Sequence, residues 1–194
     1  MNHAHEARQE EKPAATLRPS KPHWRLLAFL ALIWLLLDQA TKQLAVKHLA
    51  DVPPKAVIPD FFSLVLVHNR GAAFGFLNDP NIDWQFWLFL AATIVGCGLI
   101  LYLMRSLPPS RILTVGLAGI MGGALGNLID RVRFRAVVDF LDFYYGDWHW
   151  PAFNVADIGI CLGAGLVLII MWKSNPQGAL PPERQNGRKS GGKK

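Results

Sequence analysis

Four long apolar segments restrict this chain to the folds of membrane proteins. They span approximately residues 26–45, 84–104, 112–129 and 155–172, each close to the ~20 residues with which a helix crosses ~30 Å of hydrocarbon. Their apolar residues are continuous rather than periodic, and 52% of the 194 residues are hydrophobic, which exceeds the needs of a soluble domain. We therefore predict an all-α membrane protein with four transmembrane helices.

Basic residues predict how these helices are oriented. Thirteen of the 20 Lys and Arg residues lie in the two terminal regions and in the short loop between the second and third segments. Because basic residues accumulate on the cytoplasmic side, both termini are expected in the cytoplasm and the two longer loops outside. Basic ends also suit nucleic-acid binding, but membrane topology explains them better, and we expect no nucleic-acid partner.

Composition divides the chain into three regions. Residues 1–23 form a polar N-terminal extension, residues 24–173 the membrane domain, and residues 174–194 a basic C-terminal tail. Both extensions are predicted to be disordered. No small-residue cleavage site follows the first apolar segment, which favours a membrane anchor over a removed signal peptide.

The first outer loop predicts a small extracytoplasmic β element. Residues 57–67 contain Pro59 and end near the Asn-Arg-Gly at 69–71, a pattern typical of one or two strands. Phe74 and Phe76 follow in a stretch that suits contact with lipid or a lipid-bearing ligand, although a plain amphipathic connector would look the same. Glycines on one face of the third and fourth segments would let those two helices approach closely.

Four carboxylates lie inside or beside the apolar segments: Asp38, Asp130, Asp139 and Asp157. An acid in hydrocarbon costs about 3 kcal/mol or more, so each is either functional or neutralised by a partner. Asp38 stands one turn before Lys42, in the favourable order for an ion pair, and Asp130 directly precedes Arg131. We favour ion pairing for these two acids and a functional role for Asp139 and Asp157.

Helix rise places two of the acids at one depth. Asp130 is 19 residues from Arg111, and Asp157 is 16 residues from Lys173, or about 28 Å and about 24 Å from these basic anchors. Both therefore lie at the outer edge of the hydrocarbon. Asp139 follows Asp130 by nine residues, in a loop whose apolar flanks predict that it dips back toward the membrane. Spacing alone lets Asp157 pair with either of the other two.

Two carboxylates close together in a low-dielectric site share a proton, and such a pair can activate water and protonate a leaving group. This chemistry needs no metal and no cofactor, and we expect neither. Asn127 and Asn154 each stand three residues before an Asp, where they could orient a carboxylate or hold a substrate backbone. A serine–lysine dyad has only Ser63 as an outer serine, and the HExxH zinc motif does not occur.

Five motifs between Leu26 and Trp172 resemble those of bacterial lipoprotein signal peptidase, also called signal peptidase II. They are Asp38-Gln39-Ala40-Thr41-Lys42, Asn69-Arg70-Gly71-Ala72-Ala73-Phe74, Gly122-Gly123-Ala124-Leu125-Gly126-Asn127-Leu128-Ile129-Asp130-Arg131, Val137-Val138-Asp139-Phe140 and Phe153-Asn154-Val155-Ala156-Asp157. The resemblance implies a membrane aspartic endopeptidase that removes signal peptides from prolipoproteins, cutting before a cysteine that carries diacylglyceryl. It also implies the bacterial cytoplasmic (inner) membrane, with the active site at the outer leaflet.

The same resemblance implies roles for individual residues. The catalytic aspartates correspond to Asp139 and Asp157, and Asp38 and Lys42 to a motif that supports the fold. The positions that hold the substrate or the antibiotic globomycin, or that support the two acids, correspond to Asn69, Arg70, Asn127, Asp130, Arg131 and Asn154.

Two other function classes fit the sequence less well. A proton-coupled transporter would need ionisable residues through the full depth of the membrane, and the inner halves of the last three apolar segments contain none. A non-enzymatic membrane scaffold would leave the paired Asn and Asp residues without a purpose.

Overall fold

Four long helices dominate the computed structural model, which describes residues 21–71 and 84–174. They are α1 (Trp24–Leu49), α2 (Trp84–Ser106), α3 (Arg111–Phe134) and α4 (Val155–Ser174). All four are long and apolar enough to cross a membrane, which confirms the predicted spans. Each helix ends two to five residues beyond the C-terminal end of its predicted apolar segment.

Helix α3 is the centre of the bundle. It packs against α1, α2 and α4. In its apolar 18-residue stretch 56% of the residues are buried, against 6% in that of α2. Its contact with α4 depends on glycine: a Cβ added to Gly119 would lie 2.7 Å from the carbonyl oxygen of Gly159. Small residues thus bring the two backbones together, as the glycine pattern predicted.

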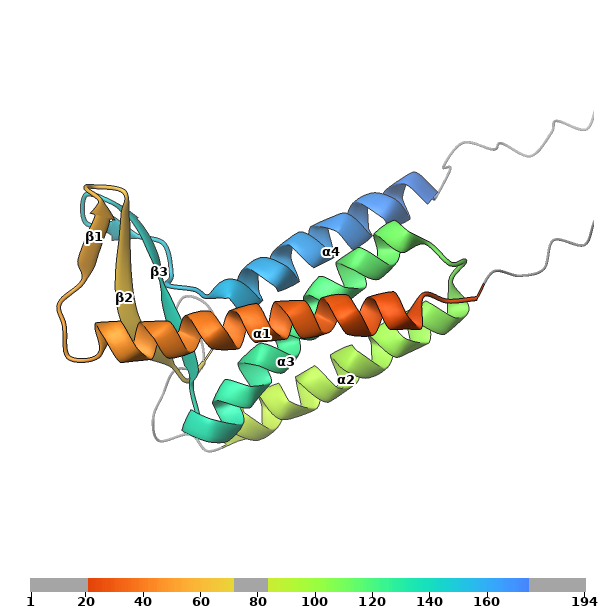
Figure 1. Cartoon of the computed structure of the whole chain (residues 1–194), viewed down its shortest axis with the longest axis horizontal. Helices are drawn as coiled ribbons and strands as arrows, with labels where there is room; N and C mark the ends of the chain where they lie inside the picture. Colours follow the sequence, from red (N-terminus) through yellow and green to blue (C-terminus); the bar gives the residue numbers. More distant parts are fainter. Residues whose placement is uncertain (1–20, 72–83, 175–194) are drawn as a thin grey trace, which may run out of the picture.

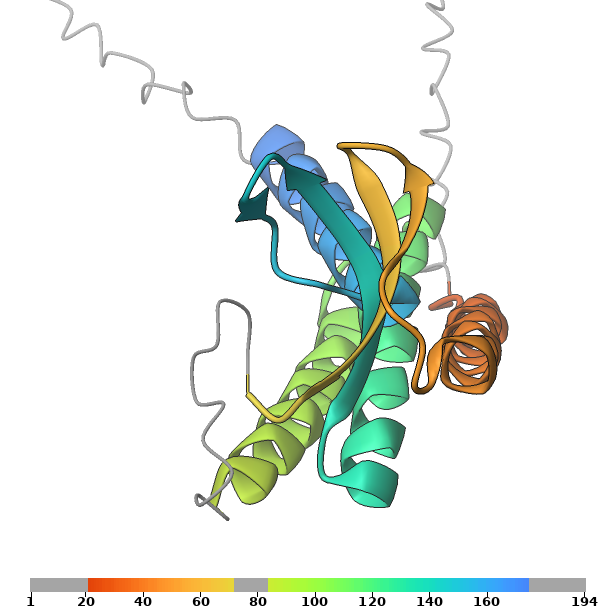
Figure 2. The same ribbon diagram turned by 90° about the vertical axis from the view of Figure 1, so that its left-hand side faces the viewer.

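A four-stranded antiparallel sheet lies at one end of the helices (Figure 1). Its strands, in spatial order, are β1 (Lys55–Ile58), β2 (Phe62–Asn69), β3 (Val137–Tyr145) and β4 (Trp148–His149). The predicted β element is therefore two strands, β1 and β2, that meet at a turn in which Asp60 has φ 58°. Seen from the sheet end, β3 crosses the ends of α3 and α4, and α1 stands to one side (Figure 2).

The prediction of a loop around Asp139 is wrong, because this segment is strand β3. Residues 137–140 of that strand are all buried. A strand buried on both faces shows no alternation of apolar and polar residues, so the sequence lacks the period of two that would have revealed it.

The outer surfaces of the helices are apolar. Trp87, Val95 and Leu168 are each more than 60% exposed, a pattern that suits contact with lipid rather than water. The chain enters α1 and leaves α4 at the end opposite the sheet (Figure 1). That this end faces the cytoplasm stays a prediction. Phe74, Phe76 and nearly all of the extensions 1–23 and 174–194 lie outside the described residues.

Candidate active site

A buried ion cluster joins α1 to α3. Nζ of Lys42 is 2.9 Å from Oδ2 of Asp38, one turn earlier on α1, and 2.8 Å from Oδ2 of Asp130 on α3. All three side chains are at most 3% exposed. The predicted pairing of Asp38 with Lys42 is confirmed. The predicted pairing of Asp130 with Arg131 is wrong, because consecutive residues of a helix face different directions.

Backbone and amide donors satisfy the other oxygens of this cluster. Oδ1 of Asp38 accepts from the N–H of Ala156 at 2.9 Å, and Oδ2 of Asp130 accepts from the N–H of Val138 at 3.2 Å. Gln39 donates Nε2 to Oδ1 of Asp130 at 3.0 Å. The cluster therefore fixes the start of α4 and the start of β3 relative to α1. Gln39 was not among the predicted site or supporting residues. Its position beside Asp38, as a polar residue in an apolar segment, could have indicated such a role.

Strand β3 holds Asp139 between two amide donors. Asn69, the last residue of β2, donates Nδ2 to Oδ2 of Asp139 at 3.1 Å, and Asn154 donates Nδ2 to Oδ1 at 2.6 Å. The Asp139 residue is 2% exposed. A strand, rather than the predicted loop, brings this carboxylate back to the ends of the helices.

Asn154 and Asp157 form a reciprocal cap at the beginning of α4. The N–H of Asp157 donates to Oδ1 of Asn154 at 3.1 Å, and the N–H of Asn154 donates to Oδ2 of Asp157 at 3.2 Å. Such a cap satisfies free N–H groups of the first turn, and the carboxylate favours the positive end of the helix dipole. Since the same Asn154 also binds Asp139, this one residue contacts both acids.

Asn127 links the ion cluster to Asp157. Its Oδ1 accepts from Nζ of Lys42 at 2.8 Å and from Nδ2 of Asn154 at 3.2 Å, and its Nδ2 donates to Oδ1 of Asp157 at 2.9 Å. Each of the two asparagines therefore binds an acid that lies outside its own Asn-x-x-Asp repeat. Of the two pairings that spacing allowed, the structure brings Asp139 and Asp157 together, while Asp130 faces Lys42.

The environment of Asp139 favours its protonated form. Burial, together with the negative charge of Asp157, raises the pKa of the Asp139 carboxyl from 3.8 to about 7, although Asn69 and Asn154 act in the opposite direction. Asp157 is only half-buried and stays accessible. A carboxyl group that holds its proton up to about pH 7, beside a second and accessible carboxyl group, suits acid–base activation of water.

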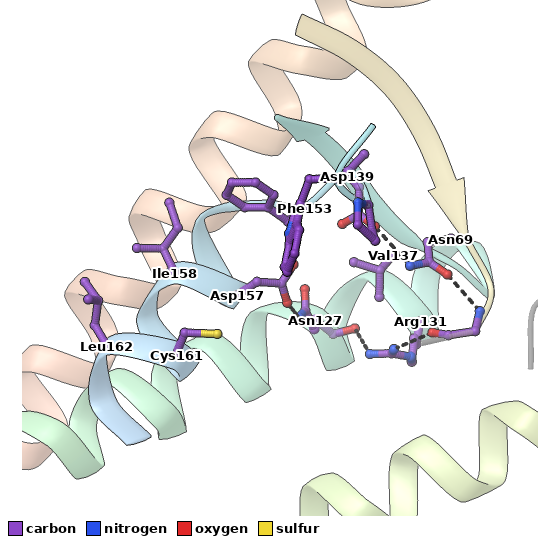
Figure 3. A pocket seen from close by; sticks show the side chains of 14 residues that line it. Asn69, Asn127, Arg131, Val137, Asp139, Phe153, Asp157, Ile158, Cys161 and Leu162 are labelled. Atoms are coloured by element: carbon purple, nitrogen blue, oxygen red, sulfur yellow. Dashed lines mark hydrogen bonds between the residues drawn. The ribbon is translucent and has the colours of Figure 1, made fainter. Parts of the chain in front are cut away.

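A cavity of about 560 Å³ opens in front of the two acids (Figure 3). Its polar end contains Asp139, Asp157, Asn69, Asn127 and Arg131. Its remaining wall is mainly apolar and includes Trp150, Phe153, Ile158 and Leu162. The aromatic residues before Asn154 were not among the predicted site residues. A cluster of aromatic residues next to a predicted site motif could have indicated that they line the site.

Arg131 lines the polar end of the cavity. Its Nη2 donates to the carbonyl oxygen of Gly71 at 3.3 Å, and its guanidinium lies 4.2 Å from the centre of the Phe89 ring. Its Nε is buried and has no hydrogen-bond partner among the described residues. Arg70 is exposed at the end of β2 and does not line the cavity. The structure therefore gathers Asn69, Asn127, Arg131 and Asn154 around the acids. Of the predicted substrate-binding or supporting residues, Arg70 and Asp130 lie outside this group.

Ser63 is the outer serine that a serine–lysine dyad would require. It is buried in the sheet, where its Oγ donates to Oδ2 of Asp142 at 3.0 Å. Asp142 also lies 3.0 Å from Nδ1 of His149 on β4. Among the described residues Ser63 forms no hydrogen bond with a lysine, and it does not line the cavity.

Comparison with known proteins gives a consistent family. The family model described as signal peptidase (SPase) II matches residues 30–173. The lipoprotein signal peptidase of Nitratidesulfovibrio vulgaris is 51% identical over 84% of this chain and 96% of its own length, and that of Oleidesulfovibrio alaskensis is 51% identical over 79% and 98%.

A solved structure described as a bacterial membrane enzyme, determined by the in meso method at 2.3 Å resolution, has the same fold. It is similar with a TM-score of 0.70 and 28% sequence identity, over 81% of this chain and 93% of that one. Fold, membrane-spanning helices and sequence agree. The chain belongs to the signal peptidase II family.

Proposed function

We propose that this protein is a membrane aspartic endopeptidase that removes signal peptides from prolipoproteins, with Asp139 and Asp157 as its catalytic pair. The observation that supports this most directly is the shared cavity, which is lined both by the buried Asp139 on β3, whose pKa is raised to about 7, and by the accessible Asp157 on α4. The membership of the chain in a peptidase family supplies the reaction class.

The two acids divide the proton transfers of peptide hydrolysis. Asp157 takes a proton from water as the water oxygen attacks the scissile carbonyl carbon, and Asp139 gives its proton to the carbonyl oxygen. The tetrahedral diol then collapses: Asp157 donates a proton to the leaving nitrogen, the C–N bond breaks, and a diol hydroxyl returns a proton to Asp139. Both acids end in their starting states, so no external acid or base is consumed.

The hydrogen-bond network keeps these roles separate. Asn69 and Asn154 hold Asp139 through both of its oxygens, and Asn127 holds one oxygen of Asp157. Arg131 provides a positive charge near the carboxylates and a buried Nε–H that faces no protein acceptor among the described residues. We assign this N–H to the substrate backbone, because an unmatched buried donor otherwise costs about 1–3 kcal/mol.

The shape of the cavity suits a lipid-bearing substrate. Its apolar side follows α4 through Ile158 and Cys161 to Leu162, which is 63% exposed on the lipid-facing surface. Acyl chains can therefore lie along α4 while the peptide reaches the polar end. This geometry supports cleavage just before a diacylglyceryl-modified cysteine, whose lipid holds the scissile bond at the membrane surface.

We further propose that the sheet end of the molecule faces outward from the bacterial inner membrane. The distribution of basic residues supports this, because the termini and the loop between α2 and α3 hold thirteen of the 20 Lys and Arg residues. The active site then lies at the outer leaflet, where lipid-modified precursors are anchored.

The structure gives a transporter little support. The buried ionisable residues among the described part of the chain are Asp38, Lys42, Asp130, Asp139 and Asp142. All of them lie in the half of the molecule nearer the sheet, whereas a proton relay would continue to the other membrane surface.

The decisive experiment is cleavage of a prolipoprotein by the purified full-length protein, with and without diacylglyceryl on the cysteine. We expect cleavage of the lipidated form only, and its inhibition by globomycin. Asp139→Asn and Asp157→Asn should each abolish cleavage without loss of folding. Asp130→Asn should retain measurable cleavage, because Asp130 contacts Lys42 rather than the cavity. Full activity of either Asp139→Asn or Asp157→Asn would disprove the catalytic assignment.

A further inference from the structure

A second hollow lies on the other face of β3 from the cavity. It has a volume of about 690 Å³ and is bordered by α1, the end of α3 and Val138 of β3. Val137 and Asp139 line the cavity, whereas Val138 between them lines this hollow, as expected from the alternation of side chains along a strand. We call it the α1–α3 groove. It is separate from the cavity in which we place the substrate.

The α1–α3 groove has an excess of positive charge. Lys42 and Asp130 lie in its wall and belong to the buried cluster, in which Lys42 also pairs with Asp38 behind the wall. Lys47 on α1 and Arg133 on α3 also line it, and both are exposed. Within residues 21–71 and 84–174, neither of these two cations forms an ion pair with a carboxylate. Two positive charges on different helices thus face one hollow.

Helix rise places these two cations at the same membrane level. Lys47 is 22 residues from Arg25 on α1, and Arg133 is 22 residues from Arg111 on α3. Both distances correspond to about 33 Å, slightly more than the hydrocarbon thickness of ~30 Å. Since Arg25 and Arg111 lie at the opposite membrane surface, Lys47 and Arg133 stand in the layer of lipid head groups.

Apolar side chains border the same groove. Leu44 is 57% exposed and Phe134 is 46% exposed, and each lies within a few residues of one of the two cations. A free phosphate ion would leave this apolar surface uncovered. A phospholipid would cover it with acyl chains and place its phosphate between the cations.

We propose that the α1–α3 groove binds one anionic phospholipid, whose phosphate contacts Lys47 and Arg133 and whose acyl chains lie against Leu44 and Phe134. A zwitterionic lipid binds less tightly, because its ammonium group opposes the two cations. The bound lipid borders the Lys42–Asp130 pair and so braces the cluster that holds the starts of α4 and β3. This binding does not depend on the proposed peptidase reaction.

Native mass spectrometry of the full-length protein in detergent tests the site. Phosphatidylglycerol and phosphatidylcholine with identical acyl chains are titrated separately, and the affinity of the first bound lipid is measured. The groove variant is Lys47→Gln with Arg133→Gln. The matched control is Lys55→Gln with Arg135→Gln, which removes the same charge at the same end of the molecule: Lys55 is exposed on β1, and Arg135 lies over the Phe86 ring of α2.

Wild type and the control are expected to prefer phosphatidylglycerol. The groove variant should bind it more weakly by about fivefold for each cation removed, with unchanged affinity for phosphatidylcholine. Equal loss in the groove variant and the control would overturn the proposal. So would displacement of the lipid by inorganic phosphate, which would show a free-anion site, or a dimer that excludes lipid, which would show that a second copy covers the groove.

Discussion

Nζ of Lys42 lies 2.8 Å from Oδ1 of Asn127, and the same amide donates its Nδ2 to Asp157 at 2.9 Å. A lysine ammonium group only donates hydrogen bonds, so this contact fixes which end of the amide faces Asp157. Helix α1 contributes no residue to the lining of the cavity. It nevertheless controls the orientation of an acid on α4, through one lysine and one asparagine.

Lys42→Met should destabilise the protein strongly. The substitution keeps most of the side-chain volume but leaves two carboxylates without a cation at a site that is at most 3% exposed. Loss of one partner from a buried ion pair costs about 3–5 kcal/mol. Thermal unfolding in detergent should show a clear fall in Tm, and cleavage should fall further because Asn127 is no longer oriented. Lys55→Met, exposed on β1 and outside both hollows, is the control. Equal Tm values for the two variants would contradict the role of the cluster.

The helices could be predicted from the sequence because lipid imposes a simple requirement on them. Each must be apolar over about 20 residues, and that pattern is continuous and local. Strand β3 could not be predicted in the same way. It is buried on both faces and stabilised by pairing with β2, about 70 residues earlier, as in the pair Asn69 and Val137. No local pattern in residues 137–145 indicates that they pair with β2.

The candidate site was predictable in its residues and less so in its contacts. The acids were visible because a carboxylate in an apolar segment is costly. Their pairing was not, because Asp130 and Asp157 stand at similar depth and both follow an Asn by three residues. The choice depends on Lys42, which holds Asp130 away from the cavity. Such a contact joins residues 88 positions apart and becomes visible only in the fold.

Replacements of Asn154 should separate capping from catalysis. Asn154→Ser keeps an oxygen that can accept from the N–H of Asp157, but removes the amide that donates to Asp139 at 2.6 Å. Asn154→Ala removes both, and the loss of an N-cap alone costs about 1 kcal/mol. We therefore expect Asn154→Ala to have a lower Tm than Asn154→Ser. Both variants should show a similar large loss of kcat. Normal kcat for Asn154→Ser would show that the contact with Asp139 has no part in catalysis.

The raised pKa of Asp139 predicts a specific pH dependence of stability. Between pH 3.8 and about 7 the folded chain keeps a proton on Asp139 that the unfolded chain releases. The free energy of unfolding therefore falls as pH rises through this window, by up to about 1.4 kcal/mol per pH unit. Asp139→Asn lacks this proton and so lacks this loss of stability. The Tm of the variant minus the Tm of wild type should therefore increase as pH rises to about 7, and should stay constant above that pH. Parallel curves throughout would contradict the raised pKa.

Activity should respond to the same proton. In the proposed mechanism Asp139 must be protonated before it can donate to the scissile carbonyl, so the rate of cleavage should fall as pH rises through about 7. Measuring kcat/KM for a lipidated substrate across this range, in a detergent that keeps the protein folded, provides the test. A rate that keeps rising above that pH would assign the proton to another group.

Gly123→Ala should separate α4 from α3 where the active site requires them together. A Cβ at this position would overlap the carbonyl oxygen of Ala156 and lie 2.9 Å from Cγ1 of Ile160. A backbone oxygen cannot rotate away, so α4 must move, and the hydrogen bond from Asn127 to Asp157 lies one turn farther along α3. We expect a loss of about 1–3 kcal/mol in stability and a larger loss of cleavage.

Gly165→Ala is the matched control on α4, since an added Cβ there meets nothing within 4 Å. It should leave activity unchanged and stabilise the helix slightly, because alanine favours helix over glycine by about 1 kcal/mol. If both variants cleave at the wild-type rate, close packing of α3 on α4 is not what positions Asp157.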